Sequence, residues 1–108
     1  EYLSISKGVV EKVETASNSG LGQVVLRCPN CEVALWSHYG AAKETVAFVR
    51  AGTLDNPNLC PPDIHIYTAS KQRWVELGDT VAKVEAFYRK VDFWPEESIK
   101  RYKHAIAG

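Results

Sequence analysis

The feature that most constrains this chain is the sequence Cys-Pro-Asn-Cys at residues 28–31, which lies between two apolar runs. Residues 24–26 lead into it and residues 33–36 lead out of it. This pattern predicts two β-strands joined by a tight loop that carries two thiols. Cys28 and Cys31 would then present two soft ligands from one hairpin tip, which is half of a tetrahedral zinc site.

The composition is that of an ordinary globular protein. The chain has 108 residues, of which 45% are hydrophobic and 24% are charged, and this length suits one domain with a modest core. Thirteen basic residues balance thirteen acidic ones, so no overall charge attracts nucleic acid or an anionic membrane. No apolar run is long enough to predict a membrane span. We therefore expect neither nucleic acid nor a membrane as a partner.

The N-terminus and the cysteine count bear on processing and location. Residues 1–6 lack the basic region and the apolar core of a signal peptide, and the chain has no methionine, which suggests a processed product or a fragment. Three cysteines, an odd number, argue against a secreted disulfide scaffold and for a reducing compartment. The expected location is the cytoplasm.

Most of the chain reads as antiparallel β-structure. Apolar alternation and β-branched residues predict strands at residues 2–6, 9–15, 23–28, 33–39, 45–50 and 63–67. In the last of these, the period of two predicts that Ile64 and Ile66 face inward and that His65 and Tyr67 face outward. The predicted fold class is mainly β, with a helical C-terminus.

Two helices are predicted after the strands. Residues 79–89 have valines and aromatic residues at helical spacing, which predicts a short helix. Residues 94–106 give a stronger pattern, with a proline at the start, two glutamates in the first turn and apolar residues three and four positions apart.

Several short blocks of sequence resemble a known family when their order and spacing are taken together. The blocks are residues 19–20, 27–31, 33–35, 52–57, 62–66 and 71–74. In this arrangement the chain resembles the glutathione-dependent formaldehyde-activating enzyme/centromere protein V family, within the Mss4-like fold. The resemblance implies a single Mss4-like domain over residues 1–108, folded as a β-tent of antiparallel sheets. It covers about the last two-thirds of a family domain, so the N-terminal zinc-ligand segment is expected to precede residue 1.

The resemblance also implies a role for the two thiols. In the family, a structural zinc takes two ligands from an early Cys-x-Cys and two from a later Cys-x-x-Cys, and Cys28 and Cys31 match the later pair. A second, catalytic zinc in active members is held by a cysteine cluster between those motifs. The 108 residues contain neither the early pair nor that cluster. Glu32 stands where the family commonly has glycine, so a residue with a Cβ must tolerate the turn.

The activity implied by the resemblance is that of a zinc-dependent carbon–sulfur lyase. Its substrate would be a small thiol adduct such as S-hydroxymethylglutathione, and its metal would need an open coordination position. We expect no such activity from this chain alone. The alternative is a non-enzymatic β-tent module that self-associates or binds a partner, because incomplete sheets expose edges and apolar surface. A homodimer would bring two copies of the Cys28 and Cys31 pair together.

Other residues allow a functional and a purely structural interpretation. Cys60 is either a third ligand or a small residue in a proline-bound loop. His38 is a ligand or an ordinary strand histidine, and His65 lines a substrate groove or simply packs. The three tryptophans form an aromatic wall for a ligand or belong to the core, and they are Trp36, Trp74 and Trp94.

Overall fold

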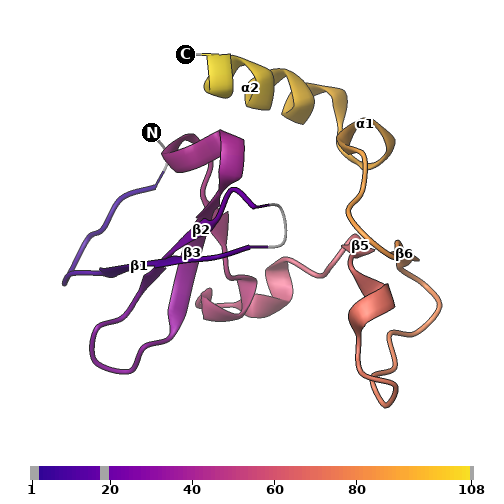
Figure 1. Cartoon of the computed structure of the whole chain (residues 1–108), viewed down its shortest axis with the longest axis horizontal. Coiled ribbons are helices and arrows are strands. Elements are labelled where there is room, and N and C mark those ends of the chain that lie inside the picture. Colours follow the sequence, from indigo (N-terminus) through magenta and orange to yellow (C-terminus); the bar gives the residue numbers. More distant parts are fainter. Residues whose placement is uncertain (1–2, 18–19, 108) are drawn as a thin grey trace. The chain divides into compact units, whose positions relative to one another are not determined.

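The computed structural model in Figure 1 describes residues 3–17 and 20–107. Contacts within the chain divide it into two compact units. The first takes in the residues up to 55 and those from 102 on, and the second takes in residues 56–101. Each unit is described by itself. Within the described part of the chain, no helix is both long and apolar enough to cross a bilayer.

A four-stranded antiparallel sheet forms the first unit (Figure 1). Its strands follow the order β1-β2-β3-β4, with β1 at Glu11–Thr15, β2 at Gln23–Arg27, β3 at Ala34–Tyr39 and β4 at Phe48–Val49. β2 pairs along its whole length with β1 on one side and with β3 on the other. This central position fits the apolar run in β2, because a strand in the middle of a sheet can bury side chains on both of its faces. The antiparallel sheet predicted from the sequence is confirmed.

The buried part of this sheet is small. Of the described residues, Leu26 and Ala42 are the buried apolar ones, at 5% and 6% exposure. Ser37 of β3 has no exposed surface, and its Oγ accepts a hydrogen bond from Arg50 Nη2 at 2.8 Å. A buried hydroxyl with a charged donor is satisfied. The sheet is therefore anchored by one apolar side chain of β2 and one polar contact of β3.

A β-bulge separates the ladder of β2 and β3 from the cysteine turn. The pairing passes from Leu26 opposite Trp36 to Arg27 opposite Ala34, so Leu35 is the extra residue. The Leu35 carbonyl instead accepts a hydrogen bond from the backbone N–H of Arg50 at 2.9 Å. A bulge bends and twists its strand, and it therefore sets the direction in which the turn leaves the sheet.

The segment after β3 differs from the strand predicted at residues 45–50. Gly40–Thr45 form the 3-10 helix η1, and β4 has only two residues, Phe48–Val49. Gly40 has φ +44°, and a Cβ there would lie 3.1 Å from Leu21 Cδ1. Glycine is suited to this position because it has no side chain to collide. The apolar residues at 45–50 predict a strand, but they do not show that the helix η1 extends to the first residue of that run, Thr45.

The first predicted strand is not formed where it is described. Residues 3–6 have no strand structure, and Tyr2 lies outside the described residues.

The second unit has a two-stranded sheet whose strands run parallel. β5 at Ile64–His65 pairs with β6 at Ala82–Lys83. Parallel strands need a long crossover connection, here residues 66–81, so antiparallel pairing does not extend to this unit. The alternation predicted over residues 63–67 is also wrong at its end. Tyr67 adopts φ +54°, and Ile66 is exposed rather than inward.

The helix predicted at residues 79–89 is wrong. This stretch contains β6 and extended backbone that bonds to the segment after β5. The Val84 N–H donates to the His65 carbonyl at 2.9 Å, and the Val84 carbonyl accepts from Thr68 N–H at 3.2 Å. These partners lie far away in sequence, so periodicity within the segment did not reveal them. β-branched valines also favour the extended backbone that this pairing needs.

The helical C-terminus is confirmed. α2 spans Glu96–Ala107 and begins directly after Pro95, whose carbonyl accepts hydrogen bonds from the backbone N–H groups of Ser98 and Ile99. Glu96 also pairs with Lys100 one turn on, at 3.1 Å. The remaining helices are short: η2 at Ala51–Thr53, η3 at Pro57–Leu59, η4 at Thr68–Ser70 and α1 at Lys90–Phe93.

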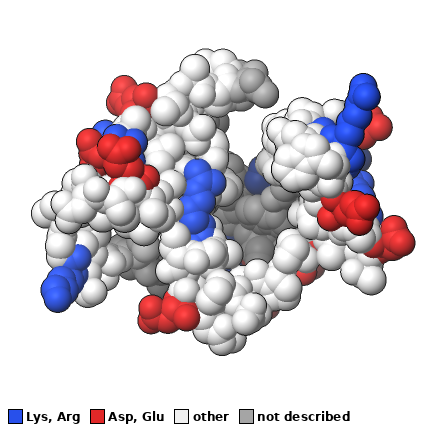
Figure 2. Space-filling view, turned by 90° about the horizontal axis from the view of Figure 1, so that it is seen from below, with Lys and Arg blue, Asp and Glu red and all other residues white. Residues whose placement is uncertain are grey.

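Charges of both signs are interspersed on the face of the molecule that Figure 2 draws. Figure 2 shows acidic and basic side chains in small groups separated by uncharged residues. This agrees with the equal numbers of acidic and basic residues in the chain.

Truncating the buried leucine of β2 tests how far the sheet depends on it. We expect Leu26→Ala to lower the free energy of unfolding by about 2–4 kcal/mol, because the change leaves a cavity at a buried position. Leu59→Ala makes the same change at a position that is 72% exposed, and we expect a cost below about 0.5 kcal/mol. Urea unfolding followed by circular dichroism measures both. Equal losses would contradict the assignment of Leu26 as the anchor.

Candidate metal site

The two cysteines lie in a tight turn between β2 and β3, as predicted. Two backbone hydrogen bonds close the turn. The Cys28 N–H donates to the Val33 carbonyl at 3.0 Å, and the Glu32 N–H donates to the Cys28 carbonyl at 2.8 Å. The positions of the thiols therefore follow from backbone geometry rather than from the packing of their side chains.

The Cys28 thiol accepts hydrogen bonds from the turn that follows it. Backbone N–H groups of Cys31 and then Asn30, together with the Cys31 side chain, lower the pKa of the Cys28 thiol, and the Glu32 N–H adds to them. Partial burial opposes this effect. Cys28 is half-buried and Cys31 is exposed. The turn thus favours a thiolate at Cys28, with a second thiol in contact with it, and thiolate is the form that binds metals.

Glu32 adopts the left-handed conformation that the turn demands. Its φ is +64°, a region in which a residue with a Cβ is disfavoured. Glu32, which stands where the family commonly has glycine, therefore lies at a position with positive φ. The turn keeps the expected shape at a cost in backbone strain.

The guanidinium next to the turn is already paired. Arg27 Nε donates to Glu11 Oε2 on β1 at 2.7 Å, and Arg27 Nη2 lies 3.8 Å from Glu32 Oε1. The hydrogen bond to Glu11 is the main cause of a raised pKa at Arg27. The polarisation of Cys28 therefore comes from backbone amides and not from this cation.

The donor set fits zinc chemistry but supplies only half of a site. Two adjacent thiols are soft ligands of the kind found in structural zinc sites, which take four ligands. Within residues 3–17 and 20–107, no group of three or more histidine, cysteine, aspartate or glutamate side chains is arranged to hold a metal. Cys28 and Cys31 lie in one turn, and their role as metal ligands stays a prediction.

His38 is held as a structural histidine. The indole N–H of Trp36 donates to His38 Nε2 at 3.2 Å, so this nitrogen is an acceptor. The proton then resides on His38 Nδ1, which donates to the Val46 carbonyl at 2.8 Å. Both ring nitrogens are used, and a metal would have to displace one of these bonds.

The other candidates from the sequence lie in the second unit. Cys60 is an exposed free cysteine, and His65 is half-buried on β5. Trp74 is 80% exposed, whereas the indole N–H of Trp94 donates to the Tyr88 hydroxyl at 2.7 Å. Trp36 belongs to the sheet of the first unit, where it lines the same hollow as Cys28.

A hollow of about 510 Å³ lies beside the cysteine turn. It is lined by the N-terminal segment at residues 4–10, by residues 28–30 of the turn, and by Leu35 and Trp36 of β3. The sequence analysis missed this segment, because its approach to Cys28 is a long-range contact with no local pattern. The amides of Asn30 and Cys31 were also missed, although the Cys-Pro-x-Cys sequence is a signal for such a turn.

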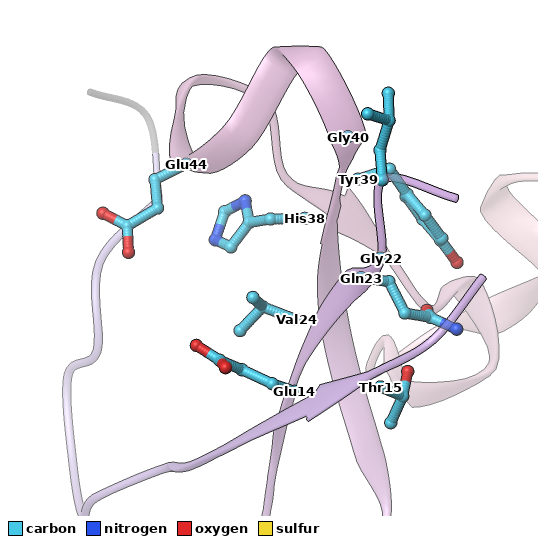
Figure 3. Close-up of a pocket in the computed structure, with 10 residues that line it drawn as sticks. Glu14, Thr15, Gly22, Gln23, Val24, His38, Tyr39, Gly40 and Glu44 are labelled. Atoms are coloured by element: carbon cyan, nitrogen blue, oxygen red, sulfur yellow. The ribbon is translucent and has the colours of Figure 1, made fainter. Parts of the chain in front are cut away.

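A second hollow, of about 380 Å³, lies where β1 ends, β2 begins and β3 ends (Figure 3). Glu14, Val24 and His38 are in register on neighbouring strands and project to one side of the sheet, where Glu44 also points. Glu44 is paired with Lys12 at 3.0 Å, and this contact is the main cause of its lowered pKa. Glu44 and His38 are thus engaged in contacts of their own, and Glu14 is the other carboxylate that lines the hollow.

The pKa shift at Cys28 can be measured by alkylation. In the metal-free chain we expect the pH midpoint for reaction of Cys28 with iodoacetamide to lie lower in the native state than in urea. The hydrogen-bonded thiolate stabilises the native state above the unfolded pKa, and this contribution is lost as the pH falls through the native pKa. Peptide-level mass spectrometry gives the midpoint. Identical native and unfolded midpoints would rule out the amide effect.

The strain at Glu32 can be tested by restoring glycine. Glu32→Gly removes a left-handed cost of about 1–2 kcal/mol, partly offset by the greater flexibility of glycine in the unfolded chain. We expect a net stabilisation of up to about 1 kcal/mol in urea unfolding. Glu32→Ala is the control, since it removes the same carboxylate but keeps the Cβ, and it should not stabilise. An alanine variant as stable as the glycine variant would refute the strain.

Comparison with known proteins agrees with the turn and the sheet. The sequence profile of the family described as glutathione-dependent formaldehyde-activating enzyme matches residues 1–70. A search of curated proteins and a search of solved structures each find no match. The matched region contains the whole four-stranded sheet, the cysteine turn and β5. The chain therefore belongs to the glutathione-dependent formaldehyde-activating enzyme family.

Proposed function

We propose that this chain is a zinc-binding part of a domain that performs carbon–sulfur lyase chemistry on a small thiol adduct. The observation that carries the proposal is the turn itself. Two backbone hydrogen bonds close it, from the Cys28 N–H to the Val33 carbonyl and from the Glu32 N–H to the Cys28 carbonyl, and both thiols lie within it. Such a turn presents two sulfur ligands from a fixed backbone. The family match over residues 1–70 supports S-hydroxymethylglutathione as the type of substrate.

Cys28 and Cys31 would hold a structural zinc at the point where β2 passes into β3. The metal would cross-link the two ends of the turn, and the amides of Asn30 and Cys31 would offset the negative charge of the thiolates. We assign no catalytic residue, since the 108 residues do not contain the cysteine cluster that holds a catalytic zinc in the family. We therefore propose that the chain alone is inactive and contributes architecture to the lyase domain.

The proposed location is the cytoplasm. A reducing environment keeps thiols free to bind metal, and the three cysteines of the chain are all unpaired in the structure. The balanced charge further supports a small-molecule substrate over nucleic acid or a membrane surface.

A metal titration and a turnover assay test this proposal. We expect the metal-free chain to bind Co²⁺ with a sulfur-to-metal charge-transfer band that Zn²⁺ abolishes. Cys28→Ser and Cys31→Ser should each weaken Co²⁺ binding. The loss should exceed the roughly 10–100-fold that is typical when a residue hydrogen-bonded to a metal ligand is replaced. Cys60→Ser should bind Co²⁺ as the unchanged chain does. Formaldehyde and glutathione should not be turned over by the chain. Absence of thiolate binding would contradict the metal role, and measurable turnover would contradict the proposed inactivity.

A non-enzymatic role is the second candidate, and the exposure of apolar side chains favours it. Large apolar residues of the sheet unit are exposed, namely Leu3, Ile5, Val9, Leu21, Val33, Phe48 and Val49. Such surface and a strand at the sheet edge, here β1, favour association with another chain. Light scattering tests this candidate. Association that survives removal of metal supports it, and a strict monomer at high concentration contradicts it.

A further inference from the structure

We infer that the hollow at the end of the four-stranded sheet binds the ammonium group of a small molecule, with Gln23 Oε1 as its hydrogen-bond acceptor and Glu14 as its counter-charge. None of the residues that line this hollow belongs to the cysteine turn. The site follows from the residues of the hollow. Only the identity of the molecule rests on the proposed function, since a glutathione adduct carries one free ammonium group.

A buried acceptor in the hollow has no donor. Gln23, the first residue of β2, lines the hollow. Its Oε1 is buried, and no donor in the part of the chain that the structure describes reaches it. An amide oxygen that leaves water without gaining a partner costs free energy, and native proteins keep few such atoms. A donor that enters the hollow would recover this loss.

The charges around the hollow favour a positively charged donor. Two carboxylates line it, those of Glu14 and Glu44. The Glu44 carboxylate pairs with Lys12 at 3.0 Å, whereas the Glu14 carboxylate makes no ion pair with any residue that the structure describes. His38 adds no positive charge while its Nε2 accepts the Trp36 indole N–H. An ammonium group would supply the missing charge together with three N–H donors.

The shape of the hollow suits a small group. Its volume of about 380 Å³ lies near the lower end of the range for small-molecule sites, and Gly22 and Gly40 line it without side chains that would fill it. Because the hollow lies at the end of the sheet, it reaches both faces, and Figure 3 shows Glu14 on one side and Gln23 on the other. Glu14 precedes Thr15, the ladder partner of Gln23. One group at this end can therefore meet the acceptor of one face and the charge of the other.

The test is a binding titration of the 108-residue chain, followed by NMR of its backbone amides. The probe is S-methylglutathione, which has a free ammonium group and no thiol to bind metal. N-acetyl-S-methylglutathione, which lacks the ammonium group, is the matched control. We expect the acetylated probe to bind at least about 10-fold more weakly, because a hydrogen bond to a charged group is lost. Shifts caused by the first probe should centre on residues 14–15, 21–24, 38–40 and 44.

Two variants test the two contacts separately. Gln23→Leu replaces the unpaired amide with an apolar group of similar size. We expect it to weaken binding of S-methylglutathione about 10-fold or more and to raise the urea midpoint of the free chain, because a buried unpaired acceptor is removed. Glu14→Gln should weaken binding about 2–5-fold, as expected for an exposed charge, and should reduce the dependence of binding on salt. Glu97→Gln, the control, removes an exposed carboxylate of α2 and should bind as the unchanged chain does.

Three results would overturn the inference. Equal binding of both probes would show that the ammonium group is not recognised. Absence of binding, or shifts centred away from the hollow, would show that the hollow is not its site. An unchanged urea midpoint in Gln23→Leu would show that the amide already has a partner, such as water. Each leaves the metal role of the cysteine turn intact, because Co²⁺ binding is measured separately. Loss of Co²⁺ binding with probe binding retained would refute the proposed function alone and support the ammonium site.

Discussion

The antiparallel pairing of β2 with β3 is the interaction on which the rest of the structure depends. It places β2 in the centre of the sheet, where Leu26 is buried, and it brings Ser37 of β3 within reach of Arg50. It also holds both ends of the cysteine turn, since Cys28 bonds to Val33 directly beyond the ladder. Disruption of this pairing would separate the two ends of the turn and with them the two thiols.

The chemistry of the turn is a property of its backbone. Amide dipoles from Asn30 and Cys31 converge on the Cys28 sulfur and favour the thiolate, as they favour other anions held by successive N–H groups. The neighbouring Arg27 makes its short contact with Glu11 across the sheet instead. A metal bound here would therefore meet ligands held by a turn whose backbone is already fixed, and binding would require little rearrangement.

Because few side chains of this unit are buried, a bound metal would contribute a large share of its stability. Few described residues are fully buried, and many large apolar side chains remain exposed. Small domains with limited cores commonly gain stability from a metal or from association. Because ligand geometry exists only in the folded state, binding free energy would add directly to folding free energy.

The sequence by itself determined the features that depend on neighbours along the chain. Apolar runs on either side of residues 28–31 predicted the hairpin that carries the two thiols, and the spacing of apolar residues after Pro95 predicted α2. Local conformational preference and periodicity suffice for such elements. The family resemblance, rather than any local pattern, indicated that position 32 favours glycine, and Glu32 has φ +64°.

Only the tertiary structure decided the features that depend on distant partners. Residues 79–89 have helical spacing, yet Val84 is held extended by hydrogen bonds to His65 of β5 and to Thr68. His38 has the chemistry of a ligand, but Trp36 and Val46 occupy its two nitrogens. The bulge at Leu35 and the approach of residues 4–10 to Cys28 are likewise long-range contacts. The physical reason is common to all of them: a hydrogen bond to a distant residue outweighs a local preference of a few tenths of a kcal/mol.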